Sequence, residues 1–156
     1  MIKKEIVYEN IRLLHVVDHE ESDILLSELA QYAIDRHLVV EGYKEAILER
    51  EKSFPTGIKA VTGIAIPHAD QKYTVEECVV IALLEKPCVF KEMASNNDVD
   101  VSVVFMLILN NNKQVEALSR LVKIIQSEKE IQSIYEDDGC KKMYDSFGKY
   151  LRWTIT

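Results

Sequence analysis

Two continuous apolar runs constrain the fold more than any other feature of this sequence. They are Cys78–Leu84, which reads CVVIALL, and Val101–Leu109, which reads VSVVFMLIL. A strand that alternates apolar and polar residues can leave one face in water, but a strand that is apolar at nearly every position needs cover on both faces. The two runs therefore predict the centre of a sheet with helices packed on both sides.

The remaining segments supply the other strands and the covering helices. An opening strand or strand pair is predicted over Ile6–Val17, and a short strand over Gly63–Ile66 stops at Pro67. Helices are predicted by apolar spacing at Ser22–His37, about Tyr43–Lys52, the stripe Val115, Leu118, Leu121/Val122 and Ile125, the segment behind a capping box at 127–130, and Cys140–Leu151. Buried strands mixed with amphipathic helices predict an α/β fold, a mixed sheet with helices on both faces.

Charge, length and cysteine content exclude several classes of function. The 156 residues fit one domain, 1–156, and 19 basic against 26 acidic residues give a net charge of −7. Such a chain lacks the basic surface that binds nucleic acid or an anionic membrane. No apolar run approaches the ~20 residues that span a bilayer, and the N-terminus has no signal-peptide core. Three widely spaced cysteines form no metal-ligand pattern, so we expect a cytoplasmic protein with reduced thiols, no metal and no cofactor.

His68 is the residue best suited to carry chemistry. It follows the run Ile64-Ala65-Ile66-Pro67, and the proline ends the strand because it fixes its own φ and restricts the residue before it. Sites in α/β folds lie where buried strands end. A histidine of ordinary pKa is largely neutral at cell pH, so one ring nitrogen can attack phosphorus while the other is held as N–H. From the residues alone, a loop histidine without a special role is the alternative.

Two further segments could bind an anion beside such a histidine. Arg50, at the end of the second predicted helix, could hold a phosphoryl oxygen through a charge-assisted hydrogen bond; the alternative is a solvated arginine paired with neighbouring glutamates. The loop Asn110–Gln114 enters a helix, and the N–H groups of a helix N-terminus suit an anion; the alternative is an ordinary asparagine cap.

A family resemblance is carried by the segments Arg50–Ile58, which reads REKSFPTGI, and Gly63–His68, which reads GIAIPH. Together they resemble the enzyme IIA components of the sugar phosphotransferase system (PTS), in the fructose–mannitol or type 2 class. The first segment, with Asn97-Asp98-Val99, is most similar to the galactitol-type branch. The similarity runs from the first predicted helix through the helix at Val115, and nearer the ends only the helical pattern matches.

The resemblance implies a phosphohistidine carrier. The family's phosphorylated histidine falls on His68 and its active-site arginine on Arg50, within a mixed sheet of about five strands with helices on both faces. The family accepts a phosphoryl group from the phosphocarrier protein HPr and passes it to a cysteine of the IIB component, which phosphorylates sugar carried by the membrane component IIC. HPr and IIB are therefore the expected direct partners. Phe54 and Ile66 are predicted to contribute to an apolar docking patch around His68.

One position departs from the pattern of the mannitol-type members. They carry a second histidine at the start of the helix after the long strand, where this chain has Gln114. A glutamine can donate a hydrogen bond to a phosphoryl oxygen but cannot carry a proton or a charge. We therefore expect a pocket contact from Gln114 and a specificity other than mannitol.

Two other functions are open alternatives to a transporter subunit. A regulatory relative would keep His68 and signal its phosphorylation state to a transcription factor or a kinase. A non-catalytic binding domain would keep the fold and leave His68 idle. The sugar itself contacts IIB and IIC, so the galactitol assignment rests on the resemblance alone.

Overall fold

A single mixed sheet forms the centre of the computed structural model, which describes residues 1–17 and 21–154. Its six strands lie in the order β1-β2-β5-β6-β4-β3. The pairs β2/β5 and β4/β6 are parallel, and the other neighbours are antiparallel. The strands are β1 (Ile2–Tyr8), β2 (Ile11–Val16), β3 (Gly57–Ile58), β4 (Ile64–Ala65), β5 (Cys78–Lys91) and β6 (Asp98–Ile108).

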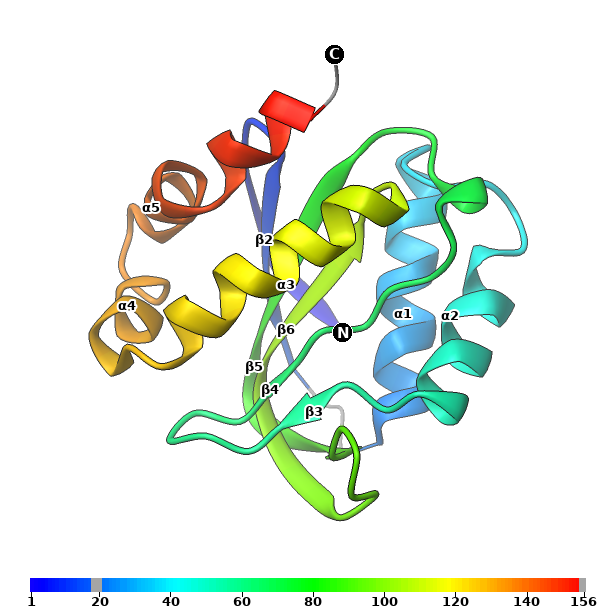
Figure 1. Cartoon of the computed structure of the whole chain (residues 1–156), viewed down its shortest axis with the longest axis horizontal. Coiled ribbons are helices and arrows are strands. Elements are labelled where there is room, and N and C mark those ends of the chain that lie inside the picture. The colour runs from blue at the N-terminus through cyan, green and yellow to red at the C-terminus, as the bar shows by residue number, and fades with distance from the viewer. Residues whose placement is uncertain (18–20, 155–156) are drawn as a thin grey trace.

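Helices cover both faces of this sheet (Figure 1). On one face lie α1 (Ser22–Asp35) and α2 (Tyr43–Ser53). On the other lie α3 (Asn111–Ile125), α4 (Glu128–Ser133) and α5 (Gly139–Ser146). Two short 3-10 segments complete the fold, η1 (Gln71–Tyr73) and η2 (Gly148–Thr154).

The two apolar runs form the middle of the sheet, as predicted. Along β5, Val80 and Ala82 pack among the residues of α1 and α2, whereas Val79 and Ile81 pack among those of α3 and α5. Alternate side chains of a strand point to opposite faces, so each run contributes to two cores. The predicted α/β architecture is confirmed, and the strand count exceeds five because the two-residue β3 pairs with β4.

The buried face of α3 differs from the predicted stripe by one residue. Val115 is 69% exposed, while Ala117, Leu121 and Ile124 are buried. The buried face also includes Gln114 and Lys113, and Lys113 is 0% exposed. Because two polar side chains occupy core positions at the start of the helix, the apolar pattern alone predicted a buried face that is shifted by one residue.

The C-terminal segment packs against the sheet as two short pieces rather than one helix. α5 ends at Ser146, and η2 follows. Phe147 and Leu151 are buried, at 0% and 2% exposure, so this apolar stripe points inward. Gly148 lies between them against Asn10 and Ile11, where a Cβ would meet both side chains.

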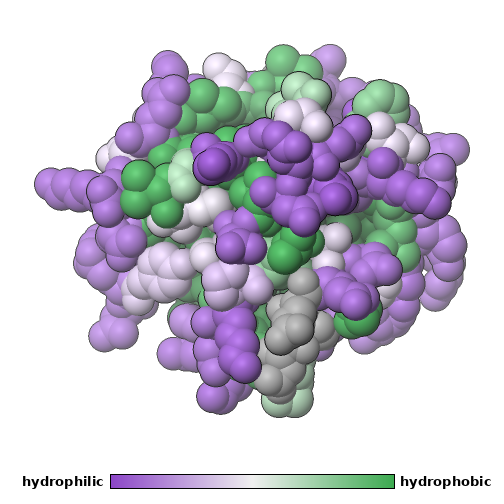
Figure 2. Space-filling view, turned by 90° about the horizontal axis from the view of Figure 1, so that it is seen from below, coloured by the Kyte–Doolittle hydropathy of each residue, from purple (hydrophilic) through white to green (hydrophobic). Residues whose placement is uncertain are grey.

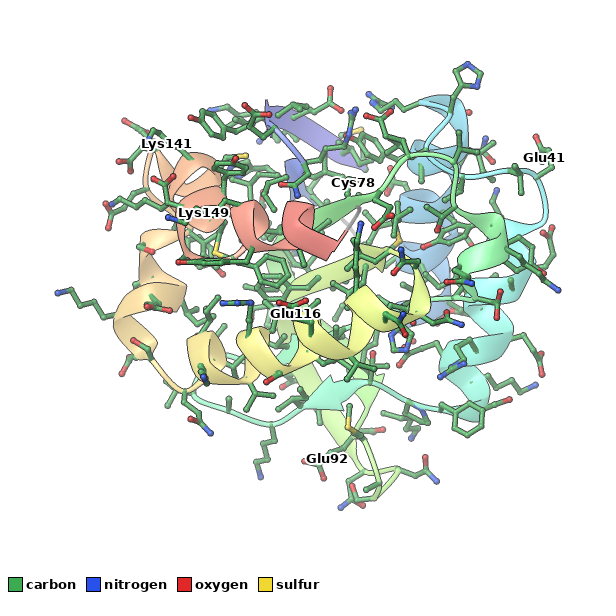
Figure 3. The ribbon with its side chains drawn as sticks, turned by 45° about the horizontal axis from the view of Figure 1, so that its top comes forward. Glu41, Cys78, Glu92, Glu116, Lys141 and Lys149 are labelled. Carbon is green, nitrogen blue, oxygen red and sulfur yellow. The ribbon has the colours of Figure 1, made fainter. Side chains whose placement is uncertain are left out.

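One face of the protein is mostly hydrophilic, and the thiols are inside. Seen from below, hydrophilic side chains surround scattered apolar ones (Figure 2). Figure 3 places Cys78 in the interior and charged residues such as Glu41 and Lys141 at the periphery; all three cysteines are free and buried. Among the described residues, no helix has both the length and the apolar character to cross a bilayer.

Candidate functional site

His68 lies where β4 leaves the sheet, as its sequence context predicts. β4 ends at Ala65, but the next residues stay beside β6: the Leu107 N–H donates to the Pro67 carbonyl at 3.0 Å, and His68 forms an isolated parallel bridge with Leu107. The strand can approach β6 this closely because residue 63 is glycine, since a Cβ there would collide with the carbonyl of Asp100. His68 itself is half-buried.

The loop that carries His68 is fixed on both sides of the histidine. Before it, the Ile66 N–H donates to Thr56 Oγ1 at 3.0 Å. After it, the Ala69 carbonyl accepts a hydrogen bond from Gln114 Nε2 at 2.9 Å. Together with the contact of Pro67 to β6, these bonds leave the histidine backbone little freedom, which suits a side chain that must meet a partner in one orientation.

The imidazole of His68 is held by one ring nitrogen. Its Nδ1 lies 3.0 Å from the Ile66 carbonyl oxygen. A carbonyl oxygen can only accept, so Nδ1 carries the hydrogen and Nε2 presents its lone pair. Burial lowers the pKa of His68 below its usual value and the positive charge of Arg50 lowers it further, against the opposing effect of the Ile66 hydrogen bond. The ring is therefore neutral and nucleophilic at neutral pH.

Arg50, in the last turn of α2, is close enough for its charge to act on His68, and Phe54 lies beside Arg50. The Arg50 guanidinium is 4.9 Å from the centre of the Phe54 ring, and both residues are exposed. In the described part of the chain no ion pair engages Arg50, contrary to the alternative that it pairs with neighbouring glutamates. A guanidinium available beside a histidine fits the binding of an incoming phosphoryl group.

Gln114 approaches the loop but uses its amide on the backbone. Nε2 donates to the carbonyls of Ala69, at 2.9 Å, and Leu109, at 3.0 Å. An amide nitrogen has two hydrogens, so neither is left for a phosphoryl oxygen. In this structure Gln114 therefore joins α3 to the His68 loop through the main chain, and its contact with a phosphoryl group stays a prediction. The neighbouring Asn110 is an ordinary N-cap, accepting from the Lys113 N–H at 3.2 Å.

The prediction that Ile66 lies on the partner surface is wrong. Its side chain is 0% exposed, because it points into the core shared with α3. What Ile66 offers the site is its main chain. Phe54, at 63% exposure, keeps its predicted place on the surface.

Sequence reasoning gave no role to Glu51 and Thr56, which form a compact pair behind the His68 loop. The Thr56 N–H donates to Glu51 Oε2 and the Thr56 hydroxyl to Oε1, both at 2.8 Å. Burial raises the pKa of Glu51 to about 7, although both Thr56 bonds oppose the shift. Both residues lie in the REKSFPTGI segment, but their contact with Ile66 spans ten residues and no spacing rule signals it.

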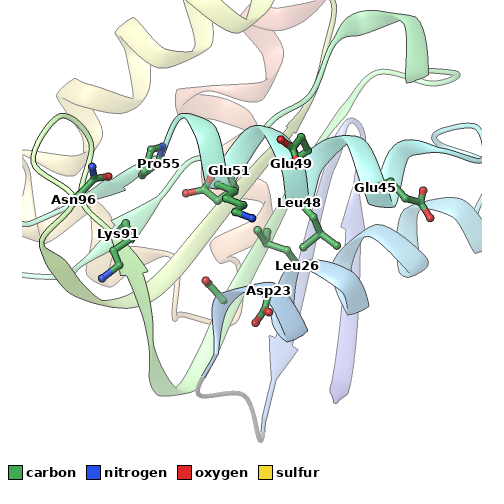
Figure 4. Close-up of a pocket in the computed structure, with 11 residues that line it drawn as sticks. Asp23, Leu26, Glu45, Leu48, Glu49, Glu51, Pro55, Lys91 and Asn96 are labelled. Atoms are coloured by element: carbon green, nitrogen blue, oxygen red, sulfur yellow. The ribbon is translucent and has the colours of Figure 1, made fainter.

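The Glu51 side chain also reaches a cavity of about 800 Å³ behind α2. Figure 4 shows Glu51 and Pro55 on one wall, with Asp23 and Leu26 of α1 facing them. His68 does not line this cavity.

Comparison with known proteins identifies the family. The sequence model of "Phosphoenolpyruvate-dependent sugar phosphotransferase system, EIIA 2" matches residues 8–148. The chain belongs to this EIIA family. The galactitol-specific EIIA component of Escherichia coli K12 is 30% identical to this EIIA protein over 105 residues, which are 67% of this chain and 68% of the relative.

Solved structures agree with the EIIA fold. Mannitol enzyme IIA of Escherichia coli, in its complex with phosphorylated enzyme IIB, superposes with a TM-score of 0.68 at 17% identity, over 92% of this chain and 97% of that chain. The nitrogen regulatory protein IIA-Ntr of Neisseria meningitidis superposes with a TM-score of 0.67 at 20% identity, over 88% and 92% of the two chains. The family and fold inferred from the sequence are confirmed, and this EIIA protein is a sugar PTS component.

Proposed function

We propose that His68 Nε2 accepts a phosphoryl group from phospho-HPr and passes it to a cysteine of a IIB component, in the cytoplasm. One observation carries the proposal: the bond between Nδ1 and the Ile66 carbonyl, which leaves Nε2 as the free nucleophile. The lowered pKa of His68 supports it, because only the neutral ring can attack.

The transfer exchanges one phosphorus–nitrogen bond for another. The Nε2 lone pair forms a bond to phosphorus in line with the bond to the donor histidine, which breaks and returns its electron pair to the donor nitrogen. The Nδ1–H stays hydrogen-bonded to the Ile66 carbonyl throughout, so this carbonyl stabilises the positive charge that develops on the ring. Arg50 faces the equatorial oxygens. Transfer to IIB reverses these roles, with a thiolate sulfur as the attacking atom.

The partner surface follows from what is exposed around the loop. Phe54, beside Arg50, and Val115, in the turn of α3 that carries Gln114, present apolar side chains to solvent. A small apolar patch with a polar rim suits a transient partner that must leave after each transfer. The substrate class we propose is a sugar alcohol of the galactitol type, which rests on the 30% identical relative from Escherichia coli.

A phosphorelay assay tests this proposal. The protein is mixed with phosphoenolpyruvate, enzyme I and HPr, and intact mass and acid lability are measured, with His68→Ala as the control. We expect one acid-labile phosphate on the wild type and none on the variant. An unlabelled wild type, beside a standard IIA protein that is labelled in parallel, would leave a binding domain that has kept the fold and lost the chemistry.

Addition of a galactitol-type IIB protein then separates a transporter subunit from a regulator. A transporter subunit loses its phosphate to the IIB cysteine within the assay. A regulatory relative is phosphorylated on His68 but retains the phosphate in the presence of IIB.

A further inference from the structure

We propose that Glu51 and Thr56 are positioning residues for phosphotransfer, which hold His68 through the main chain of Ile66 in the tautomer with Nε2 free. The proposal rests on the proposed function of His68. Four hydrogen bonds form the connection: two from Thr56 to the Glu51 carboxylate, one from the Ile66 N–H to Thr56 Oγ1, and one between His68 Nδ1 and the Ile66 carbonyl.

The direction of each hydrogen bond follows from the groups involved. The Ile66 N–H can only donate, so Thr56 Oγ1 is its acceptor at 3.0 Å. The hydroxyl hydrogen of Thr56 then has to point elsewhere, and Glu51 Oε1 at 2.8 Å receives it. The second carboxylate oxygen accepts the Thr56 N–H. A carboxylate accepts at both oxygens and donates at neither, so the ionised Glu51 leaves one arrangement of hydrogens.

The anchored Ile66 is the residue that fixes the imidazole. Thr56 holds its N–H and the His68 ring is bound to its C=O, so both main-chain groups of Ile66 are committed. Pro67 has no N–H of its own. Its carbonyl accepts a hydrogen bond from the Leu107 N–H of β6, so the peptide between Pro67 and His68 is held as well. Release of the Ile66 N–H would let the Ile66 carbonyl turn away from His68 Nδ1. The ring would then be free to place its hydrogen on Nε2, the atom that must attack.

A structural role is the alternative: Glu51 and Thr56 lie at the two ends of the turn that joins α2 to β3, and their bonds also close this turn. That role predicts a loss of stability with no change in the His68 ring. The two roles differ in a spectroscopic signature, since the ¹⁵N chemical shifts of Nδ1 and Nε2 report which nitrogen carries the hydrogen.

The test uses three variants and a matched control on the full chain at pH 8. Thr56→Val removes the hydroxyl while keeping the shape, Thr56→Ser restores it, and Glu51→Gln replaces one acceptor by a donor. Thr62→Val makes the same change as Thr56→Val in the bend that precedes β4. Imidazole ¹⁵N spectra, the rate of phosphorylation by phospho-HPr and thermal unfolding are measured for each.

We expect Thr56→Val and Glu51→Gln to shift His68 to a mixture of tautomers and to slow phosphorylation roughly 10- to 100-fold, the cost of a misplaced reactive group. Thr56→Ser recovers most of the wild-type rate and tautomer, and Thr62→Val matches the wild type. If Thr56→Val does not fold, Glu51→Gln carries the test, because it keeps the size of the side chain.

The proposal is overturned if both variants keep the wild-type tautomer, whatever their stability, or if their tautomers shift without a change in rate. Failure of the proposed function looks different. In that case the wild type takes no phosphate from HPr, while the imidazole spectra still show whether Glu51 and Thr56 hold the ring.

Discussion

We expect the buried carboxyl of Glu51 to make a contribution to stability that is present at low pH and is lost as the pH rises. Burial raises the pKa of Glu51 from 4.5 to about 7 in the folded state. Between these values the folded chain holds a proton that the unfolded chain has released, so the free energy of unfolding decreases with increasing pH. At about 1.4 kcal/mol per pH unit the full effect is roughly 3 kcal/mol, of which about 2.5 kcal/mol falls between pH 5 and pH 8.

Glu51→Gln isolates this contribution because glutamine does not titrate. The free energy of unfolding of both proteins is measured by urea denaturation at pH 5, 6, 7 and 8. We expect the wild type to lose about 2.5 kcal/mol relative to the variant across this range. The other charged groups around the Glu51 cavity are present in both proteins, so their titration cancels in the difference; they are Asp23 on α1, Glu45, Glu49 and Lys52 on α2, and Lys91 on β5.

Parallel pH profiles for the two proteins would refute this reasoning. They would mean that the pKa of Glu51 is unshifted in the folded state, because its bonds to Thr56 offset its burial. A difference that grows in the opposite direction, with the wild type gaining stability at pH 8, would lead to the same conclusion more strongly.

Three further outcomes follow from the site and its supports. Arg50→Gln removes a positive charge that acts on His68, so we expect the pKa of His68 to rise, which an NMR titration of the ring measures. An unchanged pKa would show that Arg50 has no electrostatic effect on His68. Gly63→Ala forces β4 away from β6 and costs roughly 2 to 4 kcal/mol in urea denaturation, and a cost below about 0.5 kcal/mol would contradict the tight strand contact. Glu77→Ala removes the carboxylate that lies 2.7 Å from the fully buried Lys113, and we expect it to lower the free energy of unfolding by about 2 to 3 kcal/mol in urea denaturation. The loss is smaller than for a fully buried pair because Glu77 is partly exposed. An unchanged free energy of unfolding would refute the ion pair.

The sheet could be predicted from sequence because its signal is local. β5 and β6 contain long apolar runs, and the short β4 is followed within two residues by Pro67, so the central strands and the place of His68 follow from neighbouring residues. The one-residue error on α3 has the opposite cause. Lys113 and Gln114 are buried because their polar groups meet Glu77 and two main-chain carbonyls, partners that are distant in sequence or belong to the backbone.

The supports of the site were beyond sequence reasoning for the same reason. The roles of Glu51 and Thr56 depend on a hydrogen bond that the Ile66 N–H makes only after β3 and β4 have paired. The side chain of Ile66 is buried in the core, as its hydrophobicity predicts, while its main-chain carbonyl forms part of the site. Residue type predicts the fate of a side chain, but only the tertiary structure shows which main-chain groups are left to hold a histidine.

The placement of Arg50 suits both states of a reversible carrier. Before transfer its positive charge lowers the pKa of His68, so the ring stays neutral and Nε2 keeps its lone pair. After transfer the group on Nε2 carries negative charge, and the same guanidinium attracts it. The Ile66 carbonyl has the complementary effect, because it accepts the Nδ1–H of the neutral ring and of the phosphorylated ring alike. In the proposed mechanism the same two residues therefore support both the free and the phosphorylated ring.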